Sequence, residues 1–117
     1  MAEKDLAGRK AIVTGSATGL GRSIALRLAE RGADVIINCT RSIDEGEATV
    51  AACNEAGAQA QLVAADVSTE EGAAKLAEAA SAWGRLDILV NNAGITRHAR
   101  DHSDLDALSR ADFIDTY

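Results

Sequence analysis

Residues 11–21 read AIVTGSATGLG, an apolar run that leads directly into three glycines. The run at 11–13 has no polar residue alternating with the apolar ones, which is typical of a β-strand covered on both faces. Beyond the glycines, Ile24 and Leu28 have the four-residue spacing of one helix face, which predicts a helix over residues 21–31. The stretch therefore predicts a strand, a sharp turn and a helix.

Similar apolar runs recur at residues 35–37, 61–64 and 88–90, at intervals of roughly 25 residues. This spacing suits alternating strands and helices rather than hairpins. With right-handed crossovers, such a chain forms a parallel sheet with helices on both faces. We therefore expect an α/β fold, the first half of a Rossmann-like doubly wound parallel sheet, with strand order 3-2-1-4.

The predicted helix ends follow from local chemistry. Gly32, Gly57 and Gly84 each stand just before an apolar run, where glycine adopts a positive φ without a Cβ clash. Two Ser-x-x-Glu patterns, beginning at Ser42 and Ser68, predict capping boxes at the starts of two helices.

Composition places the chain among globular proteins of one domain or part of one. Its 117 residues are 47% hydrophobic and carry 12 basic against 18 acidic side chains, a net charge of −6. This acidity argues against a nucleic-acid partner, and the charged amino terminus is unlike a signal peptide or membrane span. Cys39 and Cys53 lack CxxC spacing, so we expect reduced thiols and a soluble, cytoplasmic protein.

In a parallel α/β sheet, ligands bind beyond the carboxyl ends of the strands. After the first strand, Gly15, Gly19 and Gly21 allow the backbone to turn sharply and to approach a pyrophosphate, whose charge a helix amino terminus favours. The alternative interpretation is a flexible glycine-rich turn without a ligand.

The second strand is followed by Thr40, Arg41 and Ser42, where a dinucleotide site holds the adenosine ribose. An NAD site favours a carboxylate here, and the sequence has none before Asp44. The Arg41 guanidinium instead suits a 2′-phosphate, with hydroxyls on both sides. The alternative is an ordinary exposed arginine near a helix start.

Polar and small residues also follow the third and fourth strands. Asp66 and Val67 stand where an adenine edge would lie, although Asp66 could equally help to cap the helix at Ser68. Residues 91–94 read Asn-Asn-Ala-Gly, two amides able to tie strand ends together and two side chains too small to obstruct a ring. We expect the residues after all four strands to converge at one edge of the sheet.

The glycine pattern of residues 14–21, Asp66 and the Asn-Asn-Ala-Gly of residues 91–94 occur in this order along the chain. Together they resemble the ordered motifs of the short-chain dehydrogenase/reductase family, over about residues 9–96. Within that family, Thr-Arg-Ser at 40–42 is similar to the NADP-preferring 3-oxoacyl-acyl-carrier-protein reductases.

The resemblance implies a nicotinamide cofactor, with NADP(H) favoured and NAD(H) as the alternative. The preference rests on Arg41, because Thr18 stands where NADP-dependent members often carry a basic residue. The implied partners of the complete protein are this dinucleotide and a small carbonyl or alcohol substrate, and we expect a homo-oligomer. The implied cofactor-binding residues are Gly15, Ser16, Thr18, Gly19, Leu20, Gly21, Thr40, Arg41, Asp66, Val67, Asn92, Ala93 and Gly94.

The family protonates the nascent alkoxide with a Tyr acidified by a Lys four residues further on. Here Tyr117 is the last residue, so the sequence contains no Tyr-x-x-x-Lys and we assign no catalytic residue. The segment 105–117 resembles the start of the family's fourth helix, with a capping pattern at 109–112. We therefore expect residues 1–117 to be a partial dinucleotide-binding domain, inactive alone, with an open apolar edge at 86–90.

Three functions remain open from the sequence. The first is the NADP(H)-binding half of an oxidoreductase that interconverts a ketone or 3-oxoacyl group and an alcohol. The second is a non-catalytic nucleotide-binding or sensing module. The third is a structural or interaction half-domain whose glycines only form turns.

His98 and His102, with Asp101 and Asp104, have a spacing that a metal site could use. A polar loop, however, gives no closed ligand set in fixed geometry. We therefore expect solvated loop residues and predict no metal.

Overall fold

The structure is a computed structural model that describes residues 4–92 and 113–115. Its strands form one parallel sheet in the order β3-β2-β1-β4-β5. The predicted α/β class and the order 3-2-1-4 are confirmed. The elements are β1 Lys10–Val13, α1 Gly19–Glu30, β2 Asp34–Cys39, α2 Ile43–Glu55, β3 Ala60–Ala64, α3 Glu70–Ser81, β4 Ile88–Asn91 and β5 Phe113–Asp115.

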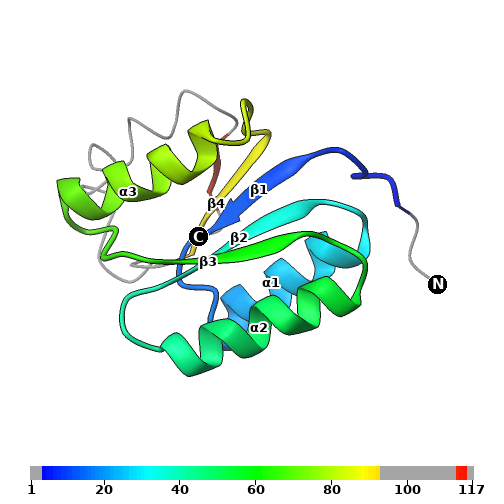
Figure 1. Cartoon of the computed structure of the whole chain (residues 1–117), viewed down its shortest axis with the longest axis horizontal. Helices are drawn as coiled ribbons and strands as arrows, with labels where there is room; N and C mark the ends of the chain where they lie inside the picture. Colours follow the sequence, from blue (N-terminus) through cyan, green and yellow to red (C-terminus); the bar gives the residue numbers. More distant parts are fainter. Residues whose placement is uncertain (1–3, 93–112, 116–117) are drawn as a thin grey trace.

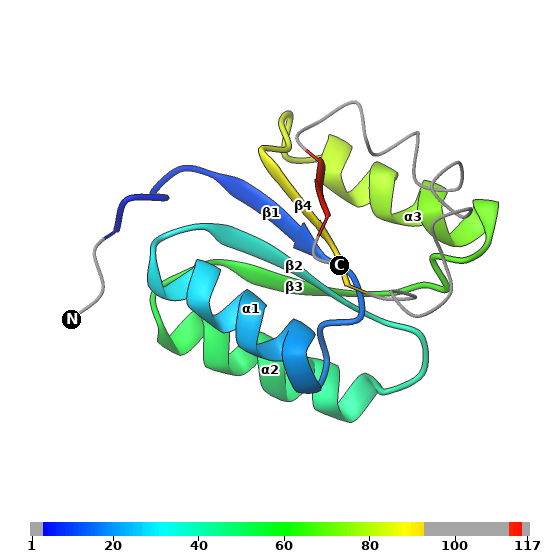
Figure 2. The same ribbon diagram turned by 180° about the vertical axis from the view of Figure 1, so that it is seen from behind.

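The sheet lies between two layers of helices. Figure 1 and Figure 2 show α1 and α2 on one face and α3 on the other. Successive strand residues alternate between two cores, with Ile12 and Ile36 on the α3 side and Val13 and Ile37 on the side of α1 and α2. A shift of one residue would exchange the two faces, so this alternation fixes the register of the strands.

The glycines predicted to end helices do so. Gly32, Gly57 and Gly84 have φ values of +105°, +104° and +79°. These values lie in the region where only glycine avoids a steric penalty, so each glycine allows the chain to leave its helix and turn back toward the sheet.

Neither predicted capping box forms as expected. Ser42 is the N-cap residue of α2, but its side chain makes no capping hydrogen bond. The N-cap of α3 is Thr69, whose hydroxyl oxygen accepts from the Gly72 N–H at 3.0 Å. The Ser68 hydroxyl instead donates to the Asp66 carboxylate at 2.6 Å, a charge-assisted bond that is stronger than a bond to a neutral group.

The predicted helix at the end of the chain is wrong over residues 113–115, which form β5. This strand pairs in parallel with β4, with Leu89 opposite Phe113 and Val90 opposite Ile114. An aromatic and a β-branched residue favour a strand, and the pairing satisfies backbone groups of β4. The predicted open edge at 86–90 is therefore also wrong, because β5 covers β4.

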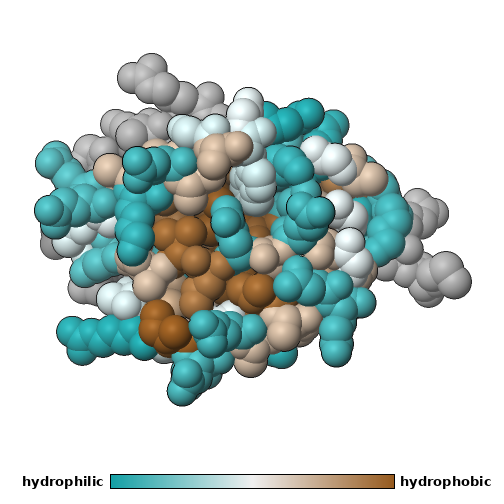
Figure 3. Space-filling view, viewed as in Figure 1, coloured by the Kyte–Doolittle hydropathy of each residue, from teal (hydrophilic) through white to brown (hydrophobic). Residues whose placement is uncertain are grey.

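At the opposite side of the described sheet, β3 has a neighbouring strand on one side only, β2. Figure 3 shows apolar surface gathered where β3 runs between α2 and α3 in Figure 1. Leu62 and Ala64 of this strand are half-buried. The edge strand thus contributes apolar surface to this face of the molecule.

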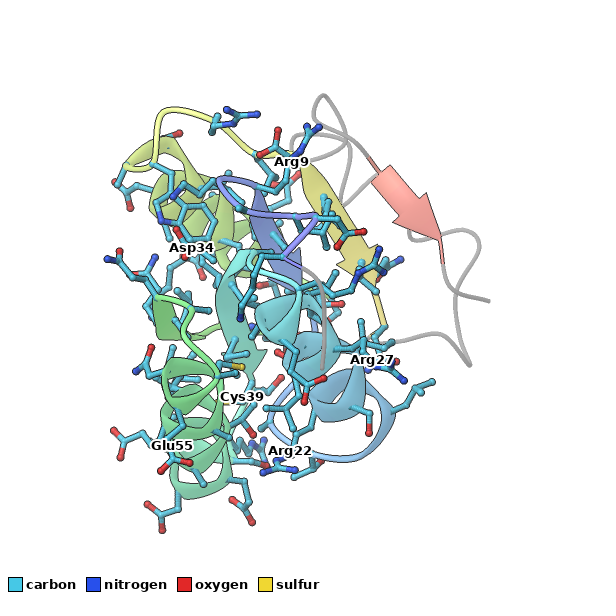
Figure 4. All side chains as sticks on the ribbon, turned by 90° about the vertical axis from the view of Figure 1, so that its right-hand side faces the viewer. Arg9, Arg22, Arg27, Asp34, Cys39 and Glu55 are labelled. Atoms are coloured by element: carbon cyan, nitrogen blue, oxygen red, sulfur yellow. The ribbon has the colours of Figure 1, made fainter. Side chains whose placement is uncertain are left out.

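Charged side chains pair at the end of the sheet where the strands begin. Lys10 Nζ lies 2.5 Å from Asp34 Oδ2, and Figure 4 shows Asp34 and Arg9 at this end and Cys39 toward the other. Burial raises the pKa of Asp34, but hydrogen bonds from Lys10 and the Gln59 N–H outweigh burial and lower the pKa below its ordinary value of 3.8. The candidate site lies at the other end.

Candidate nucleotide-binding site

The predicted convergence of the strand ends is confirmed for the described residues. The Thr14 N–H donates to Val90 O at 3.0 Å, and the Ser16 N–H donates to Asn38 O at 2.8 Å. The Ala65 N–H donates to Cys39 O at 2.8 Å. The segments that follow β1, β2, β3 and β4 therefore lie side by side at the carboxyl edge of the sheet.

The loop between β1 and α1 requires its glycines for two different reasons. Gly15 and Gly19 have φ values of +60° and +62°. Gly21 is required for space, because a Cβ there would lie 2.2 Å from the Gly15 carbonyl oxygen. At Gly19 a Cβ would meet nothing within 4 Å, so this part of the loop is open toward solvent.

The amino terminus of α1 has neither a side-chain cap nor an acidic side chain to balance its positive helix dipole. Its N-cap, Thr18, makes no side-chain capping bond, and its first turn contains no acidic residue. By contrast, the first turns of α2 and α3 carry two acidic residues each. The first N–H groups of a helix have no partner within the helix, so those of α1 are available to bind an anion.

Asn38 is a site residue that the sequence analysis did not single out. Its side chain is buried, with Oδ1 accepting from the Gly15 N–H at 2.9 Å and Nδ2 donating to the carbonyls of Val63 and Ala65, each at 3.1 Å. A lone Asn in the apolar strand DVIINC was the available signal, since buried polar groups are almost always hydrogen-bonded.

Thr49 of α2 is a second residue that was missed. Its buried hydroxyl donates to the Ala17 carbonyl at 2.9 Å. The signal was a hydroxyl residue on the helix face that also carries Cys53, four residues further on. Thr49 therefore anchors the loop from the neighbouring helix.

The predicted tie between strand ends is made by Asn92 and Thr14. The Asn92 N–H donates to Thr14 Oγ1 at 2.9 Å, and Asn92 Nδ2 donates to the Gly15 carbonyl at 3.1 Å. Ser16 is buried, and its hydroxyl donates to Val13 O at 2.6 Å. Of the predicted site residues, Ser16 and Asn92 thus hold the loop from beneath.

A cleft of about 410 Å³ opens beside the loop. It joins residues from the two predicted clusters after β1 and β2, and Thr18, Thr40 and Arg41 are exposed there. Cys39 also contributes to its wall, and burial raises the pKa of this thiol. The lining residues are Gly15, Ala17, Thr18, Asn38, Cys39, Thr40, Arg41 and Ser42.

The other predicted contacts lie beside this cleft or outside the described residues. Leu20 is 62% exposed at the start of α1. The Asp66 carboxylate accepts from both the N–H and the hydroxyl of Ser68, at 3.0 and 2.6 Å, so the capping alternative describes its contacts within the protein. Val67 is half-buried.

The remaining residues singled out from the sequence lie outside the described part of the chain. They are Ala93, Gly94, His98, Asp101, His102, Asp104 and the loop 96–106.

Residues 4–92 and 113–115 contain no group of three or more His, Cys, Asp or Glu side chains able to hold a metal ion. Among these same residues, no helix combines the length and apolar character needed to cross a bilayer.

A parallel sheet with a glycine-rich loop leading into an uncapped helix has the architecture of a dinucleotide-binding Rossmann domain. The family model for short chain dehydrogenases matches residues 9–116. The chain therefore belongs to the short-chain dehydrogenase family.

Individual relatives agree with this assignment. The chain is 48% identical over 97 residues to the hydroxyacyl-CoA dehydrogenase ChsB1 of Mycobacterium tuberculosis, covering 80% of this chain and 31% of that protein. It is 44% identical over 90 residues to a 3-oxoacyl-acyl-carrier-protein reductase of Staphylococcus aureus, covering 76% of this chain and 37% of that protein. The chain thus spans about a third of the length of these curated relatives.

The fold is also shared with solved structures. A short chain dehydrogenase from Burkholderia cenocepacia, solved in complex with NADP, superimposes with a TM-score of 0.80 at 34% identity. The match covers 91% of this chain and 51% of that one. The likeness thus extends over nearly all of this chain.

Proposed function

We propose that this chain binds NADP(H) across the carboxyl ends of β1, β2 and β4. The observation that carries the proposal is a single cleft lined by Gly15, Thr18, Thr40 and Arg41. A guanidinium beside hydroxyls suits a 2′-phosphate. The residues that line the cleft include no carboxylate to accept from the ribose hydroxyls, which favours NADP(H) over NAD(H).

The remaining contacts are assigned from the same edge of the sheet. The uncapped first turn of α1 would hold the pyrophosphate, with Gly19 giving it open access. Asp66 and Val67 would contact the adenine, and Asn92 with residues 93–94 would lie along the nicotinamide ribose. Gly21 has no Cβ, which allows the first turn of α1 to pack closely against Gly15 and Asn92.

The whole protein is proposed to interconvert a ketone or 3-oxoacyl group and an alcohol; the dinucleotide would supply the hydride for reduction and accept it in oxidation. The names of the relatives support this reaction class, since the Staphylococcus aureus relative is a 3-oxoacyl reductase. We further propose a homo-oligomer in the cytoplasm, and the free thiols of Cys39 and Cys53 fit a reducing compartment.

The second candidate is a nucleotide-binding module without catalysis. The absence of Tyr-x-x-x-Lys from the 117 residues favours it for this chain taken alone, because hydride transfer to a carbonyl also needs a proton donor. Incubation of the chain with NADPH and a 3-oxoacyl thioester tests this for the chain alone: we expect binding without oxidation of NADPH, and oxidation would refute it.

The cofactor proposal is tested by Arg41→Ala, with the Kd values of NADPH and NADH measured by fluorescence titration. Loss of a charge-assisted contact to phosphate costs about 1.5–3 kcal/mol, so we expect the Kd of NADPH to rise by about tenfold to a hundredfold or more. The Kd of NADH should stay the same. Equal weakening of both cofactors would show that Arg41 does not read the 2′-phosphate.

Arg9→Ala is the matched control. It removes the same charge at the opposite end of the sheet, where Arg9 lies 3.6 Å from Asp87. We expect both Kd values to remain at those of the unmodified chain. A loss of NADPH affinity as large as that of Arg41→Ala would show that net charge, rather than a local contact, decides binding.

A further inference from the structure

Asn38 joins three strands through one buried carboxamide. Its side chain is 1% exposed and lies between the loop after β1 and the end of β3. The two carbonyls of Val63 and Ala65 require a donor, so Nδ2 must face them and Oδ1 must face the Gly15 N–H. The orientation of the carboxamide is therefore fixed by its partners.

The backbone of Asn38 contacts the same loop. The Ser16 N–H donates to the Asn38 carbonyl at 2.8 Å, and the Asn38 N–H donates to Ser16 Oγ at 2.9 Å. Together with the side chain, three hydrogen bonds connect this one residue of β2 to Gly15 and Ser16. The start of the loop is therefore attached to the sheet and is not an independent turn.

Gly15 is held on both sides. Its N–H donates to Asn38 Oδ1 at 2.9 Å, and its carbonyl accepts from Asn92 Nδ2 at 3.1 Å. Asn38 lies on β2 and Asn92 follows β4, the two strands that flank β1. These two amides fix the peptide groups around a residue whose φ is +60°.

We propose that Asn38 is a positioning residue that sets the conformation of Gly15 and hence the shape of the dinucleotide-binding loop. This inference rests on the proposed function and deepens it. Because the Gly15 N–H is already bound to Asn38, the pyrophosphate is held by the N–H groups of the first turn of α1. Because Asn38 is only 1% exposed and its Oδ1 is bonded to the Gly15 N–H, it acts through Gly15.

The proposal is tested with Asn38→Leu, which keeps a similar volume and removes all of the hydrogen bonds of this side chain. NADPH and NADH share the pyrophosphate, so we expect both Kd values to rise by about the same factor, roughly tenfold. This equal change distinguishes Asn38 from Arg41, whose substitution should affect NADPH alone. Asn38→Ser, which is neutral and too short to bridge these partners, provides the comparison if the leucine variant fails to fold.

Ile36→Val is the matched control for stability. Ile36 lies two residues earlier on the same strand and packs in the core on the α3 side, with Leu76 and Leu89. All variants are titrated well below their unfolding temperatures. A purely structural role for Asn38 would lower the unfolding temperature and leave both Kd values equal to those of Ile36→Val, and this result would overturn the proposal.

A second measurement needs no nucleotide. In the free chain, hydrogen exchange at the Gly15 amide should be slow, because that N–H is bonded to a buried side chain. In the Asn38 variants, it should accelerate to the rate of the exposed Gly19 amide, while the core amide of Ile12 remains protected. An unchanged Gly15 rate would overturn the inference. If the unmodified chain binds neither cofactor, the proposed function fails, and the exchange measurement still decides the role of Asn38.

Discussion

Gly21→Ala is predicted to disrupt the packing of the first turn of α1 against the loop. The added Cβ would lie 2.2 Å from the Gly15 carbonyl oxygen and 2.7 Å from Asn92 Nδ2. Ordinary contact begins near 3.4 Å, so the helix and the loop must separate by about 1.2 Å. Overpacking of this kind lowers the free energy of unfolding by about 3 kcal/mol. Since the shift also breaks the bond from Asn92 to Gly15, we expect the Kd of NADPH to rise more than tenfold.

Urea unfolding and NADPH titration of three glycine variants test this reasoning. Gly19→Ala has open space but a φ of +62°, so it should cost only about 1–2 kcal/mol of backbone strain. Gly8→Ala, with a φ of +85° and nothing within 4 Å, should cost a similar amount without changing the Kd. If Gly21→Ala lowers the free energy of unfolding no more than Gly19→Ala does, the steric clash at Gly21 does not have the predicted effect.

Two further predictions concern α3 and the end of the sheet where the strands begin. Gly72→Ala places a Cβ 1.8 Å from the Asp66 carbonyl oxygen. We expect urea unfolding to show a free energy of unfolding lower by about 3 kcal/mol or more. A decrease below about 1 kcal/mol would contradict this steric contact. The pKa of Asp34 lies below 3.8 in the folded chain, so its stabilisation is complete above the unfolded value and is lost as the pH falls through the folded value. Unfolding temperatures measured from pH 6 to pH 2.5 should therefore fall less steeply for Asp34→Asn than for the unmodified chain, and equal slopes would contradict this.

The sequence was sufficient where structure depends on local chemistry. Gly32, Gly57 and Gly84 were predicted from their positions alone, because a helix that must turn back to a strand needs a positive φ at its end. The unbroken apolar runs likewise predicted buried parallel strands, and β1 and β2 lie where these runs are.

Two features escaped prediction because they depend on partners that are remote in sequence. β5 forms a strand by pairing with β4, more than 20 residues earlier, whereas the local pattern before it is that of a helix cap. Asn38 bonds to Gly15 and Val63, 23 and 25 residues away. A single polar residue in an apolar strand indicates a buried hydrogen bond, but only the fold identifies its partners.

The small buried side chains of α1 determine how closely this helix packs against the sheet. Ala25 and Ala29 are fully buried in the core that contains Val13. Because their side chains are single methyl groups, the helix packs close to the strands along this face. A larger residue at either position would lift the helix away from the sheet and carry its amino terminus with it. The distance between this helix and the sheet therefore sets the position of its first amides relative to the proposed pyrophosphate site. We expect substitutions at Ala25 to change the affinity for the proposed cofactor without contacting it.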